Sequence, residues 1–289
     1  MTILYDDAGR PNWMHVFPRF RYEDLGFSTE MGAGDVTAFD AGSGAIKAEI
    51  LIGAYQADAN ACSTPYRDPQ VSVDFDAAKS QCEGKGMGWH LMTAHEWAAI
   101  ALWCAANGFE PRGNTDWGRA HDATYEVGTR EDGDTYAPGV SNGSGRTLTG
   151  SGPSAWRHAG DPTGIADLVG NVWEWSLGAK LVDGRLYAAD VNDWTMAEAD
   201  WTDTGVDMTS ANPWTSSSTS GTELTDRLLY TYAGIDLQGR LYVNTSGERF
   251  PLRGGTRSGG SAAGLGALYL SNSRSDSRPL IGFRPAFVA

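Results

Sequence analysis

The stretch DLVGNVWEWS, residues 167–176, carries the clearest structural pattern in the chain. Its Gly-Asn pair predicts a tight loop, and residues 172–176 then alternate as a β-strand does. The alternation places Trp173 and Trp175 on one face of the strand and Glu174 on the other. Because each Trp buries a large and rigid apolar surface, we expect this pair to brace the fold.

A second apolar stretch, IGFRPAF (281–287), is expected to form a strand near the C-terminus. It contains Arg284, whose guanidinium needs an acceptor if it is buried, and Glu174 is the candidate partner. The two glycines of LRGG (252–255) allow backbone conformations that other residues avoid. A further short strand is expected at residues 185–188.

Two helices are predicted between residues 74 and 108. Asp74 or Asp76 can cap a first helix, which stops at the glycines that follow it. Thr93 with Glu96 three residues later has the pattern of a capping box at the start of a second helix. Within WHLMTAHEWAAIALW (89–103) the apolar residues recur at helical spacing, which indicates one buried face.

Composition narrows the fold class and the partners. The chain has 289 residues, 37 of them Gly and 11 Trp, which favours a loop-rich fold with aromatic anchors. Residues 109–165 and 190–225 are too long and too polar for ordinary connectors. We therefore expect an α+β fold with two helices, small twisted antiparallel sheets and much irregular loop. A net charge of −14 repels phosphate and argues against a nucleic-acid partner.

The sequence carries no membrane or metal signature. The N-terminus lacks a basic region followed by an apolar run, and no stretch approaches the roughly 18 apolar residues of a transmembrane helix. We expect a soluble protein without signal peptide or membrane insertion. Cys62, Cys82 and Cys104 have no paired spacing, which favours buried free thiols. The five His residues lack the spacing of a transition-metal site.

The C-terminal segment differs in composition from the rest of the chain. All 11 Trp residues precede it, and the stretch 256–278 consists mostly of Ser, Gly, Ala and Arg. Residues 251–289 hold five Arg and one Asp, whereas the preceding 250 residues carry a net charge of −18. Alternation in the stretch ALYL predicts a strand that buries its two Leu residues and exposes Tyr269 and Ser271.

The capped helix, the GNVWEW strand, the LRGG turn and the final IGFR strand occur in one characteristic order. Over residues 74–289 the chain resembles the formylglycine-generating-enzyme superfamily, which implies a C-type-lectin-like fold. Residues 1–73 are expected to add strands and loops to the same domain. The end of the chain, about 253–284, resembles the variable region of proteins that a diversity-generating retroelement recodes, among them phage tail-tip receptor-binding proteins.

This second resemblance implies a function in recognition. The chain would be a variable protein of a phage or prophage that binds a ligand or receptor, without catalysis. Its target would be a protein or glycan on another cell or host surface. The protein would be virion-associated, or at a cell surface by a non-standard route, and otherwise cytoplasmic. The ligand-binding, variable positions that the resemblance implies are Thr256, Ser258, Gly259, Ala262, Tyr269, Ser271, Asn272 and Asp276.

The superfamily resemblance also implies a calcium site around the GNVWEW motif. Carried over by position, its ligands are Asp167, the carbonyl oxygens of Gly170 and Val172, and Glu174. Calcium favours such oxygen donors. The alternative is that Asp167 caps a turn and Glu174 pairs with an arginine, and in that case no cofactor is required.

Two other functions are open at this point. The oxidase members of the superfamily use Cys residues near the C-terminal core, whereas no Cys follows Cys104 here, which argues against an enzyme. A metal-dependent enzyme of the superfamily is nevertheless one alternative, and bound iron or copper would favour it. A fixed-sequence lectin-like tail module is the other, and it predicts relatives that vary no more at 256–276 than elsewhere.

Overall fold

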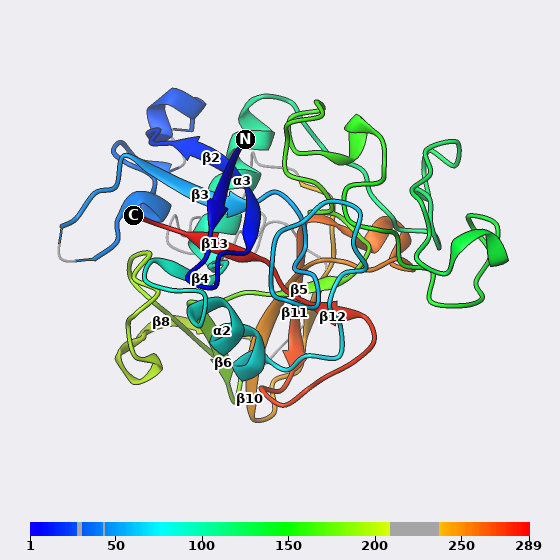
Figure 1. The fold of residues 1–289 in the computed structure, drawn as a ribbon. Coiled ribbons are helices and arrows are strands. Elements are labelled where there is room, and N and C mark those ends of the chain that lie inside the picture. Colours follow the sequence, from blue (N-terminus) through cyan, green and yellow to red (C-terminus); the bar gives the residue numbers. More distant parts are fainter. Residues whose placement is uncertain (28–30, 43, 209–236) are drawn as a thin grey trace.

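The computed structural model describes residues 1–27, 31–42, 44–208 and 237–289 (Figure 1). Two α-helices, α2 (Phe75–Glu83) and α3 (Ala94–Ala106), lie among small sheets and long loops. This arrangement confirms the α+β fold class. The strands in chain order are β1 (Thr2–Tyr5), β2 (Pro11–Pro18), β3 (Glu49–Gly53), β4 (Trp89–Leu91), β5 (Trp173–Trp175), β6 (Ala179–Val182), β7 (Arg185–Ala188), β8 (Thr202–Asp207), β9 (Leu241–Val243), β10 (Glu248–Gly254), β11 (Gly264–Asn272), β12 (Ile281–Gly282) and β13 (Pro285–Phe287).

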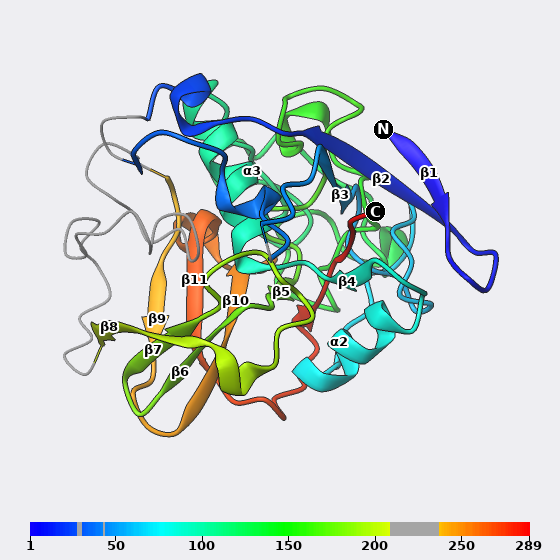
Figure 2. The ribbon, with the colours of Figure 1, turned by 90° about the vertical axis from the view of Figure 1, so that its left-hand side faces the viewer.

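Both sheets join distant parts of the chain. The first has the order β1-β2-β3-β13-β4, so the C-terminal strand β13 lies between β3 and β4. The second has the order β12-β5-β10-β6-β7-β8, and β11 pairs with β10 on one side and with β9 on the other. Figure 2 shows β9, β11 and β10 side by side. The N-terminal strands and the C-terminal segment therefore share a sheet.

The predicted strands are present, with some differences in extent. The strand expected at 185–188 is β7, whereas β4, β6, β9 and β10 were not predicted. The stretch 281–287 forms two strands instead of one, because β12 pairs with β5 in the second sheet and β13 with β3 and β4 in the first. Strand β8 lies within the expected loop 190–225, and residues 209–225 of that loop are outside the described residues.

Both helices begin where their caps predict. Asp74 Oδ1 accepts a hydrogen bond from Ala77 N (2.8 Å) at the start of α2. At α3, Thr93 Oγ1 accepts from Glu96 N (3.1 Å) and Glu96 Oε2 accepts from Thr93 N (2.9 Å), which is a capping box. Most of α3 is buried all round instead of along one face, because residues from both ends of the chain pack around it. Neither described helix is long and apolar enough to cross a bilayer.

The two Trp residues of β5 brace the second sheet against α2. Trp173 and Trp175 are buried in one cluster with Phe75 and Phe250, as the alternation predicts. Trp175 Nε1 donates a hydrogen bond to Val73 O (2.9 Å), and its ring meets the Phe75 ring edge-on with centroids 5.9 Å apart. The first residue of α2 is thereby packed directly on the strand that the GNVWEW motif forms.

The opposite face of β5 holds a buried ion pair. Arg284 Nε donates to Glu174 Oε2 (2.9 Å) and Arg284 Nη2 donates to Glu174 Oε1 (2.7 Å), which confirms the predicted pairing. The guanidinium also donates to Gly53 O (2.8 Å) and Ala166 O (2.9 Å). One side chain therefore ties the crossing between β12 and β13 to β5, to β3 and to the loop before β5.

Candidate binding surface of the C-terminal segment

Residues 256–262, here called the tail loop, connect β10 to β11 and end in the short 3₁₀ turn Gly260–Ala262. Main-chain hydrogen bonds hold the loop against two other segments. They run from Arg257 N to Asn171 O (3.0 Å), from Trp117 N to Arg257 O (2.6 Å) and from Gly260 N to Thr115 O (3.0 Å). The conformation of the tail loop is thus fixed by backbone atoms that every residue type except proline supplies.

The eight predicted ligand-binding positions differ in exposure. Ser258 is exposed, and Gly259, Ala262, Tyr269, Ser271 and Asp276 are partly exposed. Thr256 and Asn272 are buried, with 7% and 3% of their surface exposed, so the expectation that they point outward is wrong. Asn272 lies on the same face of β11 as the buried Leu268 and Leu270, because residues two apart in a strand share a face. Thr256 turns inward, where its Oγ1 accepts a hydrogen bond from Ser258 N (3.3 Å).

There is also little room for a side chain at position 259. A Cβ added at Gly259 would lie 3.1 Å from Ala263 Cβ and 3.2 Å from Thr256 O, which is tighter than usual contact. A side chain therefore fits there only if its neighbours move. Ser261, by contrast, is exposed although it is not among the eight predicted positions. The positions of the tail loop that carry a side chain outward are thus 258, 261 and 262.

The other partly exposed positions lie along or beyond β11. Nine residues of extended strand separate the tail loop from Asn272, about 25 Å at the usual rise per residue. The Tyr269 ring packs between Tyr242 and Trp173, with centroid distances of 5.0 and 5.4 Å, on the aromatic face of the sheet. Asp276 Oδ2 accepts from Ser273 N (2.7 Å) and so closes a turn. The predicted positions therefore form two groups at opposite ends of β11.

Arg257 is the charged member of the tail loop. Its guanidinium lies over the Trp117 ring, 5.2 Å from the centroid. Burial, followed by the nearby Arg146 and Arg130, lowers the pKa of the Arg257 guanidinium. Arg274, which is not one of the predicted positions, has a structural role, because it pairs with Asp76 in the first turn of α2 and with Glu198.

Several oxygens at the predicted calcium site have protein partners. The Nε2 amide of Gln56 faces Asp167 O (3.1 Å), Val172 O (3.2 Å) and Glu174 Oε1 (2.9 Å), where a cation would have to sit. Gln56 Oε1 accepts a hydrogen bond from Asn171 Nδ2 (2.9 Å), which fixes the orientation of the amide. The residues present therefore fit a calcium ion poorly.

The charges around these oxygens also disfavour a calcium ion. The Glu174 carboxylate is already neutralised by Arg284. Burial raises the pKa of the Asp167 carboxyl to about 6, and its Oδ2 accepts from Gly150 N (2.7 Å), so Asp167 joins two loops 17 residues apart instead of capping a turn of its own. A Cβ at Gly170 would lie 2.1 Å from Asn114 O, so this glycine serves close packing of the backbone. The calcium site stays a prediction without support from this geometry.

The reactive side chains of the chain are largely buried. Cys62, Cys82 and Cys104 are buried and free, and burial raises the pKa of each thiol. Burial also lowers the pKa of His158 to about 3. Within residues 1–27, 31–42, 44–208 and 237–289, no group of three or more His, Cys, Asp or Glu side chains is placed to hold a metal ion.

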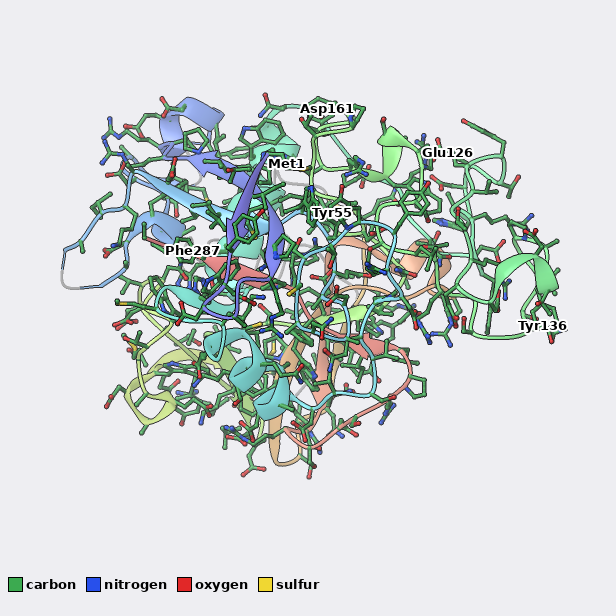
Figure 3. The ribbon with its side chains drawn as sticks, in the orientation of Figure 1. Met1, Tyr55, Glu126, Tyr136, Asp161 and Phe287 are labelled. Carbon is green, nitrogen blue, oxygen red and sulfur yellow. The ribbon has the colours of Figure 1, made fainter. Side chains whose placement is uncertain are left out.

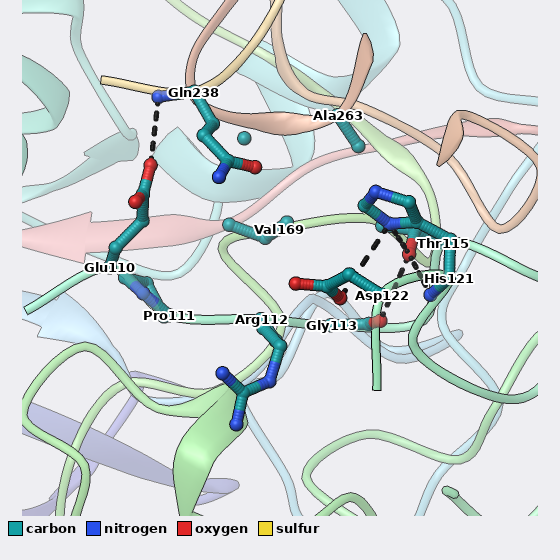
Figure 4. A pocket seen from close by; sticks show the side chains of 11 residues that line it. Glu110, Pro111, Arg112, Gly113, Thr115, His121, Asp122, Val169, Gln238 and Ala263 are labelled. Atoms are coloured by element: carbon teal, nitrogen blue, oxygen red, sulfur yellow. Dashed lines mark hydrogen bonds and ion pairs between the residues drawn. The ribbon is translucent and has the colours of Figure 1, made fainter. Parts of the chain in front are cut away.

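An open cavity of about 230 Å³ borders the tail loop (Figure 4). Ala263 and Gly264, which follow the loop, form one side of it, and the stretch 110–122 forms most of the rest. Its polar residues were not predicted individually. All of them except Gln238 lie in the long loop 109–165, where the sequence has no periodicity that could show which side chains converge.

Among known proteins, similarity to this chain was found in solved structures alone. No family model matches the sequence, and no curated protein matches it. A structure titled Major Tropism Determinant I1 Variant is 15% identical, with 82% of this chain and 50% of that chain covered and a TM-score of 0.37. The U1 Variant is 15% identical, with 89% and 56% covered and a TM-score of 0.37. PvdO from Pseudomonas aeruginosa is 14% identical, with 100% and 98% covered and a TM-score of 0.42.

These matches include both kinds of protein that the motifs resemble, a variable protein of a diversity-generating retroelement and a protein like the formylglycine-generating enzyme. The chain spans about half the length of the Major Tropism Determinant chains. At these identities and TM-scores the similarity concerns the fold and carries no argument about function. The function is therefore argued from the surface itself.

Proposed function

We propose that the chain is a target-binding protein without catalysis, and that the tail loop is the centre of its recognition surface. The observation that carries this proposal is the way in which the loop is held. Its main chain is bonded to Asn171, Trp117 and Thr115, whereas Ser258 and Ser261 point into solvent. Side chains at these positions can change while the backbone stays in place.

Such a surface suits recognition of varied targets. Exposed substitutions away from special contacts usually alter stability by less than about 0.5 kcal/mol. Small side chains on a rigid support resemble the adaptable parts of antibody loops. The C-terminal segment also has a net positive charge, since residues 251–289 hold five Arg and one Asp, whereas the rest of the chain is acidic. Its target would be a protein or glycan on a host or cell surface, reached from a virion or from the surface of a cell.

The tail loop should accept a large side chain. Ser258→Tyr is expected to change the free energy of unfolding by no more than about 0.5 kcal/mol, because Ser258 is exposed and the loop is held by its backbone. The matched control is Leu265→Ala, a buried position just beyond the loop, for which a loss of about 2–5 kcal/mol is expected. Urea denaturation measures both. A loss above about 2 kcal/mol for Ser258→Tyr would show that this position belongs to the frame.

The finer part of the proposal is that a retroelement diversifies this surface. It rests on the sequence resemblance of residues 253–284 and on the exposure, full at Ser258 and partial at Ala262, of two positions that this resemblance makes variable. The gene is expected to lie beside a reverse-transcriptase gene and a near-copy of its own 3′ end that differs at adenines. Sequencing the flanking DNA tests this. If both are missing, the retroelement is ruled out, and a fixed-sequence binding module takes its place.

A further inference from the structure

The cavity beside the tail loop has both apolar and polar walls. Pro111, Val169 and Ala263 give it apolar surface. Glu110 and Asp122 are exposed and line the cavity, Glu110 beside Gln238 and Asp122 beside His121, as Figure 4 shows. The side-chain amide of Gln238 also points into the cavity from above (Figure 4).

The two carboxylates keep most of their acceptor capacity. Glu110 Oε1 accepts one hydrogen bond, from Gln238 N (2.9 Å). Asp122 has two basic neighbours among the described residues: Arg112, whose pKa it helps to raise, and His121, whose Nδ1 lies 3.8 Å from Asp122 Oδ1. His121 Nδ1 is already 2.9 Å from Thr115 Oγ1. Each carboxylate therefore presents free oxygens to a ligand.

The positive charge in the cavity wall belongs to Arg112, which is paired with a carboxylate outside the cavity. Arg112 Nε donates to Glu126 Oε2 (2.9 Å), and Arg112 Nη2 pairs with Glu126 Oε1. Trp156 Nε1 also donates to Glu126 Oε2 (3.0 Å), so this pair is held in place. Figure 3 shows Glu126 on the loop-rich side of the molecule, away from Phe287. With Arg112 neutralised, Glu110 and Asp122 leave the cavity with net negative charge.

We propose that this cavity binds the side chain of a lysine of the protein target, as a fixed anchor beside the changeable tail loop. A lysine ammonium is a compact charge with three donors, and the carboxylates of Glu110 and Asp122 with the amide oxygen of Gln238 offer three acceptors. The lysine stem can lie along the apolar wall while its head meets the acceptors. The negative cavity also attracts a cation before contact is made. This inference depends on the proposed function for its partner.

The experiment uses small probes and needs no natural target. Ligand-observed NMR titrations of the full chain compare Nα-acetyl-lysine methylamide with Nα-acetyl-norleucine methylamide, which has the same stem without the charge. Methyl glucoside tests a sugar ligand instead. We expect saturable binding of the lysine probe and no saturation with the other two.

Charge-removing variants locate the site. Asp122→Asn and Glu110→Gln keep the shape of the side chains, and each is expected to weaken the lysine probe about tenfold or more, because a hydrogen bond to a charged group is lost. Asp134→Asn, an exposed acid outside the cavity, is the matched control and should leave the affinity unchanged. Thermal melting of each variant confirms that the fold is intact.

Several outcomes would overturn the anchor. Equal binding of the norleucine probe would show an apolar site, saturation with methyl glucoside would show a sugar site, and an unchanged affinity in Asp122→Asn with Glu110→Gln would place the lysine elsewhere. Absence of binding by the wild-type chain would also reject it. The proposed function is tested separately through Ser258, so a failed anchor leaves that result standing, and a failed Ser258 test leaves the cavity result standing.

Discussion

Replacing Arg284 by alanine is expected to lower the free energy of unfolding by about 3–5 kcal/mol. The change removes four donors and leaves the Glu174 carboxylate buried without its counter-charge. It also leaves Gly53 O and Ala166 O without their guanidinium donor. Because Arg284 joins β13 to β5, the loss affects both sheets at once. Equilibrium denaturation in urea measures it.

Arg278→Ala is the matched control for this change. Arg278 lies six residues earlier in the same segment, its side chain is 53% exposed, and its ion pair with Asp276 is 3.5 Å long. Exposed pairs of this kind contribute at most about 1 kcal/mol. A loss below 1 kcal/mol for Arg284→Ala, equal to that of the control, would mean that the Glu174–Arg284 pair does not hold the sheets together.

Replacing Trp175 by alanine is expected to cost about 3–5 kcal/mol of unfolding free energy. The side chain is 1% exposed, so its removal leaves a cavity against Phe75 and takes away the donor to Val73 O. The start of α2 would lose its support on β5. Near-ultraviolet circular dichroism and urea denaturation together report the loss of packing and of stability.

Two comparisons make the Trp175 result specific. Trp175→Phe keeps an aromatic ring and removes the hydrogen bond, and a smaller loss than for alanine is expected. Met87→Ala changes a side chain that is 95% exposed and should alter stability by no more than about 0.5 kcal/mol. If Trp175→Ala changes stability as little as Met87→Ala does, the Trp residues of β5 do not brace the fold.

These two side chains explain how the tail loop can change without loss of the fold. Trp175 and Arg284 fix the two faces of β5, and β10, which leads into the tail loop, pairs directly with β5 through Leu252 and Arg253. The stability of the frame is thus concentrated in residues that lie outside positions 258, 261 and 262. A recognition surface can vary there because its side chains contribute little to the core.

Several features could be predicted from local pattern. The capping box at Thr93 and Glu96 and the alternation of Trp173 with Glu174 depend on residues three or fewer apart, so the sequence displays them directly. The pairing of Glu174 with Arg284 followed from the need of a buried charge for a partner. The burial of Asn272 was missed, because the resemblance assigned it to the surface although alternation along the strand assigns it to the buried face.

The sequence by itself determined the α+β class, the two helices, the braced strand β5 and an unusual, small-residue C-terminal segment. Only the tertiary structure decided that Gln56 occupies the place of a cation, that the predicted contact positions divide between the two ends of β11, and that Glu110, Asp122 and Gln238 meet at one cavity. The physical reason is the distance along the chain over which each feature acts. Periodicity and caps act over a few residues, whereas burial and convergence depend on segments more than 100 residues apart that meet when the sheets form.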